Sequence, residues 1–218
     1  MVKTIYLVRH GEAEHNPTAE NIATHYKGGS AELTPRGFLQ ADKIAERATN
    51  LPVQAIIAST MTRAQQTAEV ISKSTGISVE SSDLFTEWKN PSSFVGLEWK
   101  DPETQRLERE WQQTFFTENG ARMRDGENFD DINERGKRAL ALLAKRPEEN
   151  VLVVTHGVFL RVLVGRIVFG DAFSPMMLKG LYRGFRTANT GLTLVHYDPD
   201  DPHCAWWMSL WNDHAHLG

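Results

Sequence analysis

Two histidines in this chain each follow a short apolar run and precede a glycine: His10 in VRHGEAEHN and His156 in VVTHG. A neutral imidazole is a competent nucleophile toward phosphorus at neutral pH, because its unperturbed pKa is about 6.5. Arg9, next to His10, carries a planar fork of donors that suits phosphate oxygens, and Asn16 adds a neutral donor. These residue types predict phosphoryl chemistry at the ends of two strands.

A third segment, STMTRAQQTAEVI, adds a cation. A strand is expected to end at Ser59, and Arg63 then lies in the first turn of a helix. Because a helix N-terminus already favours an anion, an arginine there is a candidate phosphate ligand. Taken alone, each arrangement is more often structural, as a local hydrogen-bonding group or a solvated helix arginine. Together they favour one site, provided that the two histidine-bearing strands are neighbours in a sheet.

The elements that must position these residues are short strands and amphipathic helices. β-Branched apolar runs predict buried strands at 4–8, 53–58, 77–80 and 151–155. Helices are predicted after Thr34-Pro35, over 61–73, after the capping residue Asn128, and over 158–168 with Gly170 as a stop. Two later strands are predicted at 191–197 and 205–211. This alternation predicts an α/β fold, a three-layer α/β/α sandwich around a mostly parallel mixed sheet.

One stretch, at about 88–125, does not follow this alternation of strands and helices. It is rich in aromatic and basic side chains, and an insertion of its length is either a functional lid or a small packed subdomain. The aromatic residues favour anchoring of an inserted helix pair to the body, and most of the basic residues are expected to form a solvated charged face. We therefore predict a single domain, 1–218, with an inserted cap segment at about 88–125.

Composition narrows the class of protein. The 218 residues carry a net charge of −4 and no basic tract, which argues against binding to nucleic acid or to an anionic membrane. The longest apolar stretch is interrupted by His156, Arg161 and Arg166, so no membrane span is expected. The single cysteine, Cys204, can form no internal disulfide and suits a reducing compartment. A globular cytoplasmic protein is predicted.

Five segments resemble, in the same order along the chain, the motifs of the histidine phosphatase superfamily, the phosphoglycerate-mutase-like proteins with an Arg-His-Gly motif. They are VRHGEAEHN, ELTPRGFLQA, STMTRAQQTAEVI, DGENFDDINERGKRAL and VVTHG. The resemblance covers most of the chain and implies the family's fold. It also implies that His10 is the residue that becomes phosphorylated. The implied phosphate pocket consists of Arg9, Arg63 and His156, with Asn16 at a further phosphate-contacting position.

The family's acid/base carboxylate follows the helix that carries the second arginine, and LFTEWKN offers Glu87 at that place. Asp83 is the alternative, but it precedes the apolar pair Leu84-Phe85 and is better explained as a turn residue. The implied mechanism is attack by His10 on a phosphomonoester, while Glu87 first protonates the leaving group and then activates water. Because a cluster of cations does the work of a metal, neither a metal nor another cofactor is predicted.

The resemblance by itself does not separate hydrolases from mutases. Phosphoglycerate mutases of the family have Glu-Arg-His-Tyr-Gly where this chain has Glu87-Trp-Lys-Asn-Pro, and no adjacent arginine pair lies between 88 and 125. We therefore predict a phosphomonoester hydrolase for a small phosphorylated metabolite, with a cofactor-dependent phosphoglycerate mutase as the alternative. The segment Gly126-Glu127-Asn128 stands where the commoner phosphatases have Gly-Glu-Ser, which leaves the substrate open. A homodimer is compatible with the sequence.

Two other classes of function fit the sequence less well. A non-catalytic phosphate- or protein-binding member of the family is expected to have lost the nucleophile or the arginines, and this chain has them all. A metal site would use His203, His214 and His216, whose spacing matches no familiar zinc pattern. The segment Asn189-Thr190-Gly191, just before a strand, is either a tight turn or the source of a backbone amide for the phosphate.

Overall fold

A mixed six-stranded sheet forms the centre of the protein in the computed structural model, which describes residues 1–14, 24–117, 120 and 122–218. The strands are β1 (Lys3–Arg9), β2 (Ala55–Ser59), β3 (Val79–Ser82), β4 (Asn150–Thr155), β5 (Leu192–Tyr197) and β6 (Trp206–Asp213). Their order is β3-β2-β4-β1-β5-β6. The first four pair in parallel, whereas β5 and β6 are antiparallel to their neighbours. The predicted mostly parallel mixed sheet is confirmed.

The pairing of β1 with β4 brings the two histidine motifs together. The strands run parallel, with Arg9 opposite Thr155, and each histidine is the next residue along its strand. The amide of His10 extends the ladder by donating to the carbonyl oxygen of Thr155 over 2.9 Å. The condition set by the sequence, that the two strands be neighbours, is therefore met.

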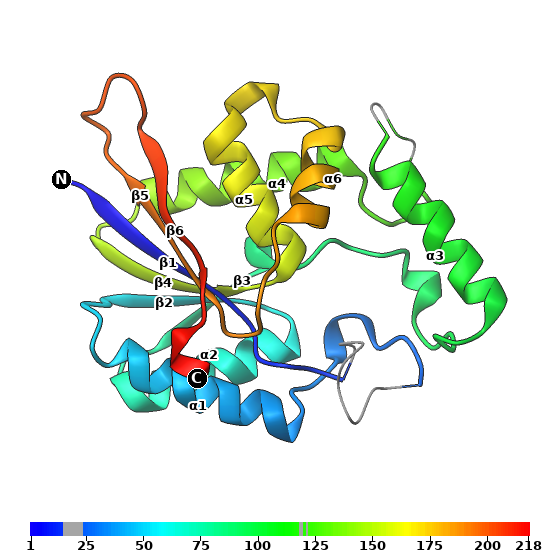
Figure 1. Ribbon diagram of the computed structural model, residues 1–218, viewed down its shortest axis with the longest axis horizontal. Coiled ribbons are helices and arrows are strands. Elements are labelled where there is room, and N and C mark those ends of the chain that lie inside the picture. The colour runs from blue at the N-terminus through cyan, green and yellow to red at the C-terminus, as the bar shows by residue number, and fades with distance from the viewer. Residues whose placement is uncertain (15–23, 118–119, 121) are drawn as a thin grey trace.

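α-Helices cover both faces of the sheet (Figure 1). They are α1 (Pro35–Ala48), α2 (Thr62–Thr75), α3 (Pro102–Phe115), α4 (Phe129–Ala144), α5 (Gly157–Phe169) and α6 (Pro175–Gly184). In Figure 1, α1 and α2 lie below the sheet, and α4, α5 and α6 lie above it. Successive residues of β1 point to opposite faces of the sheet. Tyr6 and Val8 pack with the lower helices, and Ile5 and Leu7 pack with the upper ones. In the described part of the chain, none of the helices combines the length and the apolar character needed to cross a bilayer.

Capping signals in the sequence set the helix ends. The Thr34 side chain accepts a hydrogen bond from the amide of Gly37 at the start of α1, and Asn128 forms a capping box with Asp131 at the start of α4. Gly170 follows α5 with a φ of 57°, in the left-handed region that favours glycine. These three predicted helix boundaries are confirmed.

Three details differ from the sequence-based prediction. Of the run 77–80, predicted as a buried strand, only residues 79 and 80 lie in a strand, the edge strand β3. There Glu80 and Ser81 are exposed because β3 has a neighbour on one side only. The helix α6 is additional to the predicted elements, although it begins with a capping residue and a proline. In its described residues, the stretch 88–125 contains one α-helix, α3, rather than a helix pair.

Aromatic side chains anchor this inserted stretch to the body, as predicted. Trp111 and Phe115 of α3 are buried, and the ring of Trp88 lies 4.7 and 5.0 Å from theirs, measured between centroids. Tyr182 of α6 lies 5.8 Å from Trp88 in the same way. The aromatic cluster therefore joins α3 to the helices above the sheet, although α3 itself stands apart from them in Figure 1.

Candidate active site

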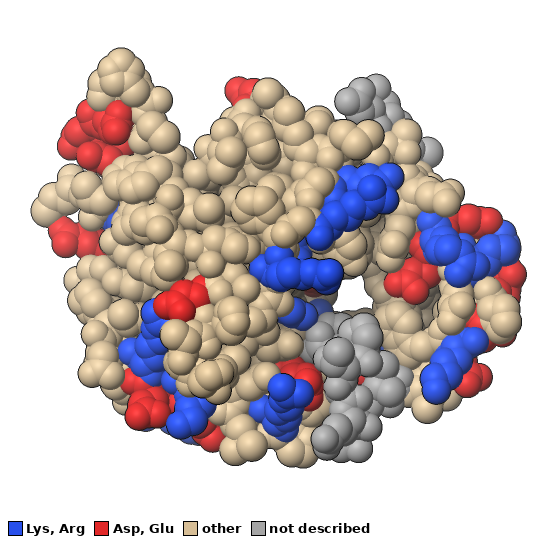
Figure 2. All heavy atoms as spheres, in the orientation of Figure 1, with Lys and Arg blue, Asp and Glu red and all other residues tan. Residues whose placement is uncertain are grey.

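The carboxyl ends of β1, β2 and β4 face a pocket of about 720 Å³. Its charged lining residues are Arg9, Lys27, Arg63, Glu87, Lys89, Asp125, Arg161 and Arg186. Six of these are cations and two are carboxylates, so the pocket is cationic although the whole chain carries a net charge of −4. Figure 2 shows Lys and Arg side chains beside the hollow between the body and the α3 segment. This composition suits an anionic ligand.

His10 lies behind this lining, buried to 1% exposure, at the carboxyl end of β1. Its Nδ1 lies 2.7 Å from the carbonyl oxygen of Gly11, an acceptor, so Nδ1 carries the proton. Nε2 then has a lone pair, and Arg63 Nε–H donates to it over 3.2 Å. The geometry therefore assigns the imidazole tautomer that a nucleophilic Nε2 requires, with a pocket-lining cation directly beside that nitrogen.

His156 lies beside His10, with 5.0 Å between ring centroids and 56° between ring planes. It is fully buried at the end of β4, where it forms the N-terminal boundary of α5. Its Nε2 lies 2.7 Å from the hydroxyl of Ser59 at the end of β2. Three neighbouring strands thus each supply one buried side chain to the same place.

Arg63 brings a buried guanidinium group to His10, and Arg9, which is partly buried, lines the same pocket. Burial lowers the pKa of each to about 10, a shift that the nearby Glu87 carboxylate opposes, and both stay charged at neutral pH. Arg9 Nη1 donates to the carbonyl oxygen of Thr187 over 2.5 Å. Its Nε is buried without an acceptor among the described residues.

Glu87 also lines the pocket, where the segment after β3 meets α5. Its carboxylate accepts from the amides of Trp88, Val158 and Phe159 over 3.0–3.1 Å, so it sits at the N-terminus of α5. Asp83 is exposed and lines a different pocket. The structure therefore brings Glu87, and not Asp83, together with the two arginines.

Two other sequence-based candidates have different outcomes. Asn16 lies outside the described residues. Asn189-Thr190-Gly191 is a turn: the amide of Thr190 donates to the carbonyl oxygen of Arg9 over 2.9 Å, and that of Gly191 to Ala188 over 3.1 Å. The Asn189 side chain donates to the carbonyl oxygen of His10 over 3.0 Å. The segment thus supports the backbone of the histidine motif through these bonds.

Of the three C-terminal histidines, His214 and His216 contact protein groups, and His203 is exposed. His216 Nε2 lies 3.1 Å from the hydroxyl of Thr190, and its Nδ1 lies 3.5 Å from Arg47 Nη1. Burial, followed by the charge of Arg47, lowers the pKa of His216. Within the described residues, no group of three or more His, Cys, Asp or Glu side chains is arranged to hold a metal ion.

Sequence reasoning missed two polar contributors. Ser59 was noted only as a strand end, and its contact with His156 depends on the strand order. Arg161 is buried, lines the pocket and donates to the carbonyl oxygens of Gly157 and Phe185 over 2.6–2.9 Å. The one signal for Arg161 was a charge inside the apolar stretch that forms α5.

Comparison with known proteins gives a consistent family. The model of the histidine phosphatase superfamily (branch 1) matches residues 5–212. A probable phosphoglycerate mutase GpmB from Enterobacter sp. (strain 638) is 34% identical over 221 residues, with 98% of this chain and 94% of the relative covered. A metal-independent phosphoserine phosphatase from Arabidopsis thaliana is 32% identical over 223 residues, with 99% and 84% covered.

Solved structures agree on the fold. A phosphoserine phosphatase from Entamoeba histolytica, in complex with 3-phosphoglyceric acid, has a TM-score of 0.73 at 21% identity, with 99% of each chain covered. A mycobacterial glucosyl-3-phosphoglycerate phosphatase has the same TM-score, 0.73, at 20% identity, with 98% of this chain and 100% of that chain covered. At these identities the likeness concerns the fold, and it matches the predicted architecture.

Proposed function

This chain belongs to the histidine phosphatase superfamily, and on that basis we propose that it hydrolyses small phosphomonoesters through a phosphohistidine formed on His10. The family resemblance found in the sequence is confirmed, as is the general enzyme class, a phosphatase of this superfamily. The observation that carries the mechanistic proposal is the contact of Arg63 Nε with His10 Nε2, which sets a cation beside the attacking nitrogen.

In the first half-reaction, a bond forms between His10 Nε2 and phosphorus while the bond from phosphorus to the ester oxygen breaks. The hydrogen bond from Nδ1 to Gly11 keeps the lone pair on Nε2. The phosphoryl oxygens take over donors of Arg63 and Arg9, whose charges stabilise the transition state. Glu87, in its protonated form, gives its proton to the leaving alkoxide.

In the second half-reaction, water attacks the phosphohistidine. The Glu87 carboxylate accepts a proton from that water, the bond from phosphorus to Nε2 breaks, and inorganic phosphate leaves with His10 again neutral. The amides of Val158 and Phe159 hold the carboxylate in place between the two steps. One residue therefore serves as acid and then as base, which requires that its position be the same in both.

The decisive test is trapping of the intermediate. Wild-type protein mixed with a labelled phosphomonoester should yield an acid-labile phosphohistidine, and His10→Ala should lose both the adduct and turnover. The exposed His203→Ala is the matched control and should behave as wild type. Glu87→Gln should slow turnover by about 100- to 10,000-fold while inorganic phosphate still binds. Full activity in His10→Ala would reject the mechanism.

Metal independence is part of the proposal, because the arginines that line the pocket supply positive charge where a metal would otherwise act. Turnover should be unchanged after treatment with excess chelator and removal of the chelated ions. Activity that falls on this treatment and returns with one added divalent cation would contradict the metal-free pocket.

Three further points belong to the same proposal. The chain is a single domain in which 88–125 forms a cap beside the pocket, supported by the lining contributions of Trp88, Lys89 and Trp99. Its substrates are small phosphorylated metabolites, as the names of the relatives suggest. Its location is cytoplasmic, since Cys204 is exposed and has no second cysteine to pair with.

A phosphoglycerate mutase remains the second candidate, because relatives at up to 34% identity carry the name probable phosphoglycerate mutase GpmB. A mutase must return the phosphoryl group to an organic acceptor before water reaches the phosphohistidine. The two reactions separate in one experiment, in which phosphoglycerate is supplied with and without bisphosphoglycerate. Phosphate release supports hydrolysis, whereas fast interconversion of phosphoglycerates without release would establish the mutase.

A further inference from the structure

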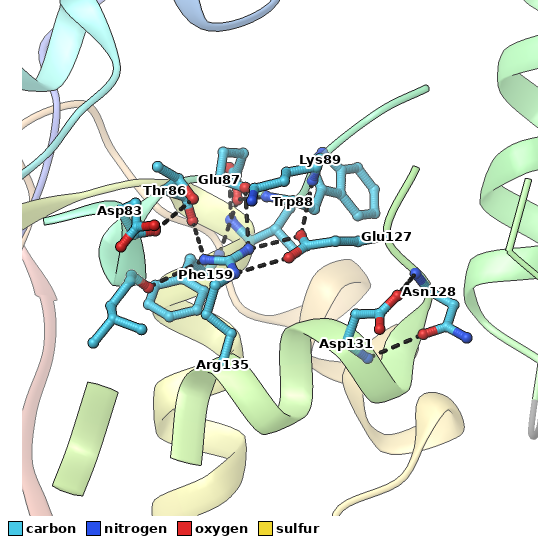
Figure 3. Close-up of polar contacts among 12 residues, drawn as sticks. Asp83, Thr86, Glu87, Trp88, Lys89, Glu127, Asn128, Asp131, Arg135 and Phe159 are labelled. Carbon is cyan, nitrogen blue, oxygen red and sulfur yellow. Dashed lines mark hydrogen bonds and ion pairs between the residues drawn. The ribbon is translucent and has the colours of Figure 1, made fainter. Parts of the chain in front are cut away.

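A buried ion pair, Arg135 with Glu127, lies beside the backbone segment that carries Glu87 (Figure 3). Arg135 of α4 donates from Nε and Nη2 to the two carboxylate oxygens of Glu127 over 2.9 and 2.7 Å. Their side chains are 4% and 11% exposed. Neither side chain belongs to the group that contacts phosphate in the proposed mechanism. Burial of two charges is costly, so their placement here calls for an explanation beyond stability.

The remaining donors of Arg135 all go to the backbone that carries Glu87. Nη1 donates to the carbonyl oxygens of Leu84 and Thr86 over 3.1 and 2.7 Å, and Nη2 donates to that of Glu87 over 3.2 Å. With the two bonds to Glu127, all five N–H groups of the guanidinium are used. Lysine has only three donors on one nitrogen, so it could not reproduce this fork.

Glu127 holds the other end of the same segment. Its carboxylate accepts from the amide of Lys89 over 2.9 Å, and its own amide donates to the carbonyl oxygen of Lys89 over 2.8 Å. The backbone from Leu84 to Lys89 is therefore fixed on both sides of Glu87. The bonds to Lys89 also tie together the two ends of the inserted stretch.

Arg135 also contacts a residue whose amide donates to the Glu87 carboxylate. The Arg135 guanidinium lies over the ring of Phe159, 4.5 Å from its centroid. The amide of Phe159 donates to Glu87 over 3.0 Å. One side chain thus contacts both the residue that carries the carboxylate and a residue that orients it.

We propose that Arg135 and Glu127 are positioning residues that set the place of the Glu87 carboxylate for proton transfer. The inference rests on the acid/base role of Glu87 in the proposed function. If the pair is broken, the backbone at Glu87 relaxes and the carboxylate shifts relative to the ester oxygen and the attacking water. A misplacement of about 1 Å can cost on the order of 100-fold in rate. The binding of phosphate by His10, Arg9 and Arg63 is expected to persist.

Leaving groups of different basicity distinguish this role from a merely structural one. An alkoxide needs a proton as it leaves, whereas a nitrophenolate leaves without one. Arg135→Met should therefore slow single-turnover phosphorylation by an alkyl phosphate on the order of 100-fold, and slow phosphorylation by a nitrophenyl phosphate by far less. General damage to the fold would slow both substrates alike.

A double-mutant cycle gives the second readout. If Arg135 acts through Glu87, Arg135→Met should cost roughly twofold or less when Glu87 is already glutamine. The inhibition constant of inorganic phosphate should stay near the wild-type value in every variant. Arg146→Met is the matched control, since Arg146 pairs with Glu80 and Glu148 in bonds of 2.7–2.8 Å and lines no part of the site pocket.

If Arg135→Met does not fold, the same experiment is done with the milder variants Arg135→Lys and Glu127→Gln. Both should reduce the rate with the alkyl phosphate more than with the aryl phosphate. The positioning role is overturned if this selectivity is unchanged in the folded variants, or if their losses multiply fully with that of Glu87→Gln. A wild-type protein without a phosphohistidine would instead reject the proposed function, so the two failures are distinguishable.

Discussion

The pocket has two ends that are built differently. The floor is formed by Arg9, His10, Ser59, Arg63 and His156. Arg63 contacts His10, His156 contacts both His10 and Ser59, and Arg9 donates to the carbonyl oxygen of Thr187. The rim, formed by Lys27, Lys89, Asp125 and Arg186, consists of exposed charges on loops. The floor comes from adjacent strands and the helices that follow them. The rim comes from segments whose positions the sheet does not set.

This contrast separates two tasks within one site. A buried charge in fixed geometry stabilises a transition state strongly, because no reorganisation is needed as charge develops. An exposed charge is screened by water and contributes about 0–1 kcal/mol. We therefore expect the floor to determine the rate of phosphoryl transfer and the rim to tune which anionic substrates bind.

Arg63→Met gives the largest expected effect and tests the floor. It removes the guanidinium group that donates to His10 Nε2. The rate of phosphohistidine formation should fall by about 100- to 1,000-fold, the usual loss when one donor to a developing charge is removed. Stopped-flow or quench measurements of the phosphorylated protein provide the rate. A loss seen only in KM would place Arg63 with the rim instead.

Ser59→Ala is expected to have an intermediate effect. The hydroxyl contacts His156 Nε2 at 2.7 Å and orients the second histidine. The loss of one buried hydrogen bond costs about 1–1.5 kcal/mol, which corresponds to roughly a tenfold fall in kcat. Steady-state kinetics should show this fall at nearly constant KM. An unchanged kcat would mean that the packing of His156, rather than this bond, fixes its ring.

Replacement of rim cations should have the smallest effect. Lys89→Ala and Arg186→Ala should each raise KM for a substrate with a second anionic group by up to about fivefold, because exposed charges contribute little. The kcat values should not change, and the KM for a simple aryl phosphate should rise less. Lys43→Ala, an exposed lysine outside the pocket lining, is the control. A large fall in kcat for either rim variant would contradict the view that only the floor determines the rate of phosphoryl transfer.

The floor was largely predictable from the sequence because its signals are local. A β-branched run that ends in His-Gly places an imidazole at a strand end, and the two runs at His10 and His156 predict two such ends. The strand order is not local: from the sequence, the adjacency of the two histidine-bearing strands is only a condition, and the pairing of β1 with β4 meets it. The capping residues Thr34 and Asn128 are local in the same sense.

The remaining contacts depend on tertiary structure. Ser59 meets His156 only because β2 is the neighbour of β4. Arg135 donates to the carbonyl oxygen of Glu87, and Glu127 accepts from the amide of Lys89, through contacts that no local pattern in the sequence specifies. The helix α3 has a capping aspartate and a proline. Most of its residues are charged or polar, however, so the sequence shows only a weak apolar pattern for the side that packs on Trp88. In these cases packing, rather than a local pattern, decides the result.

The pairing of β1 with β4 links the thermal stability of the site to that of the whole fold. The 5.0 Å between the rings of His10 and His156 is close to the roughly 4.8 Å between neighbouring strands, so the spacing follows from the backbone ladder. Both strands lie inside the sheet, where amide hydrogens exchange with solvent only when the whole fold opens. Exchange protection in β1 and β4 and catalytic competence should therefore disappear at the same temperature, as one cooperative event.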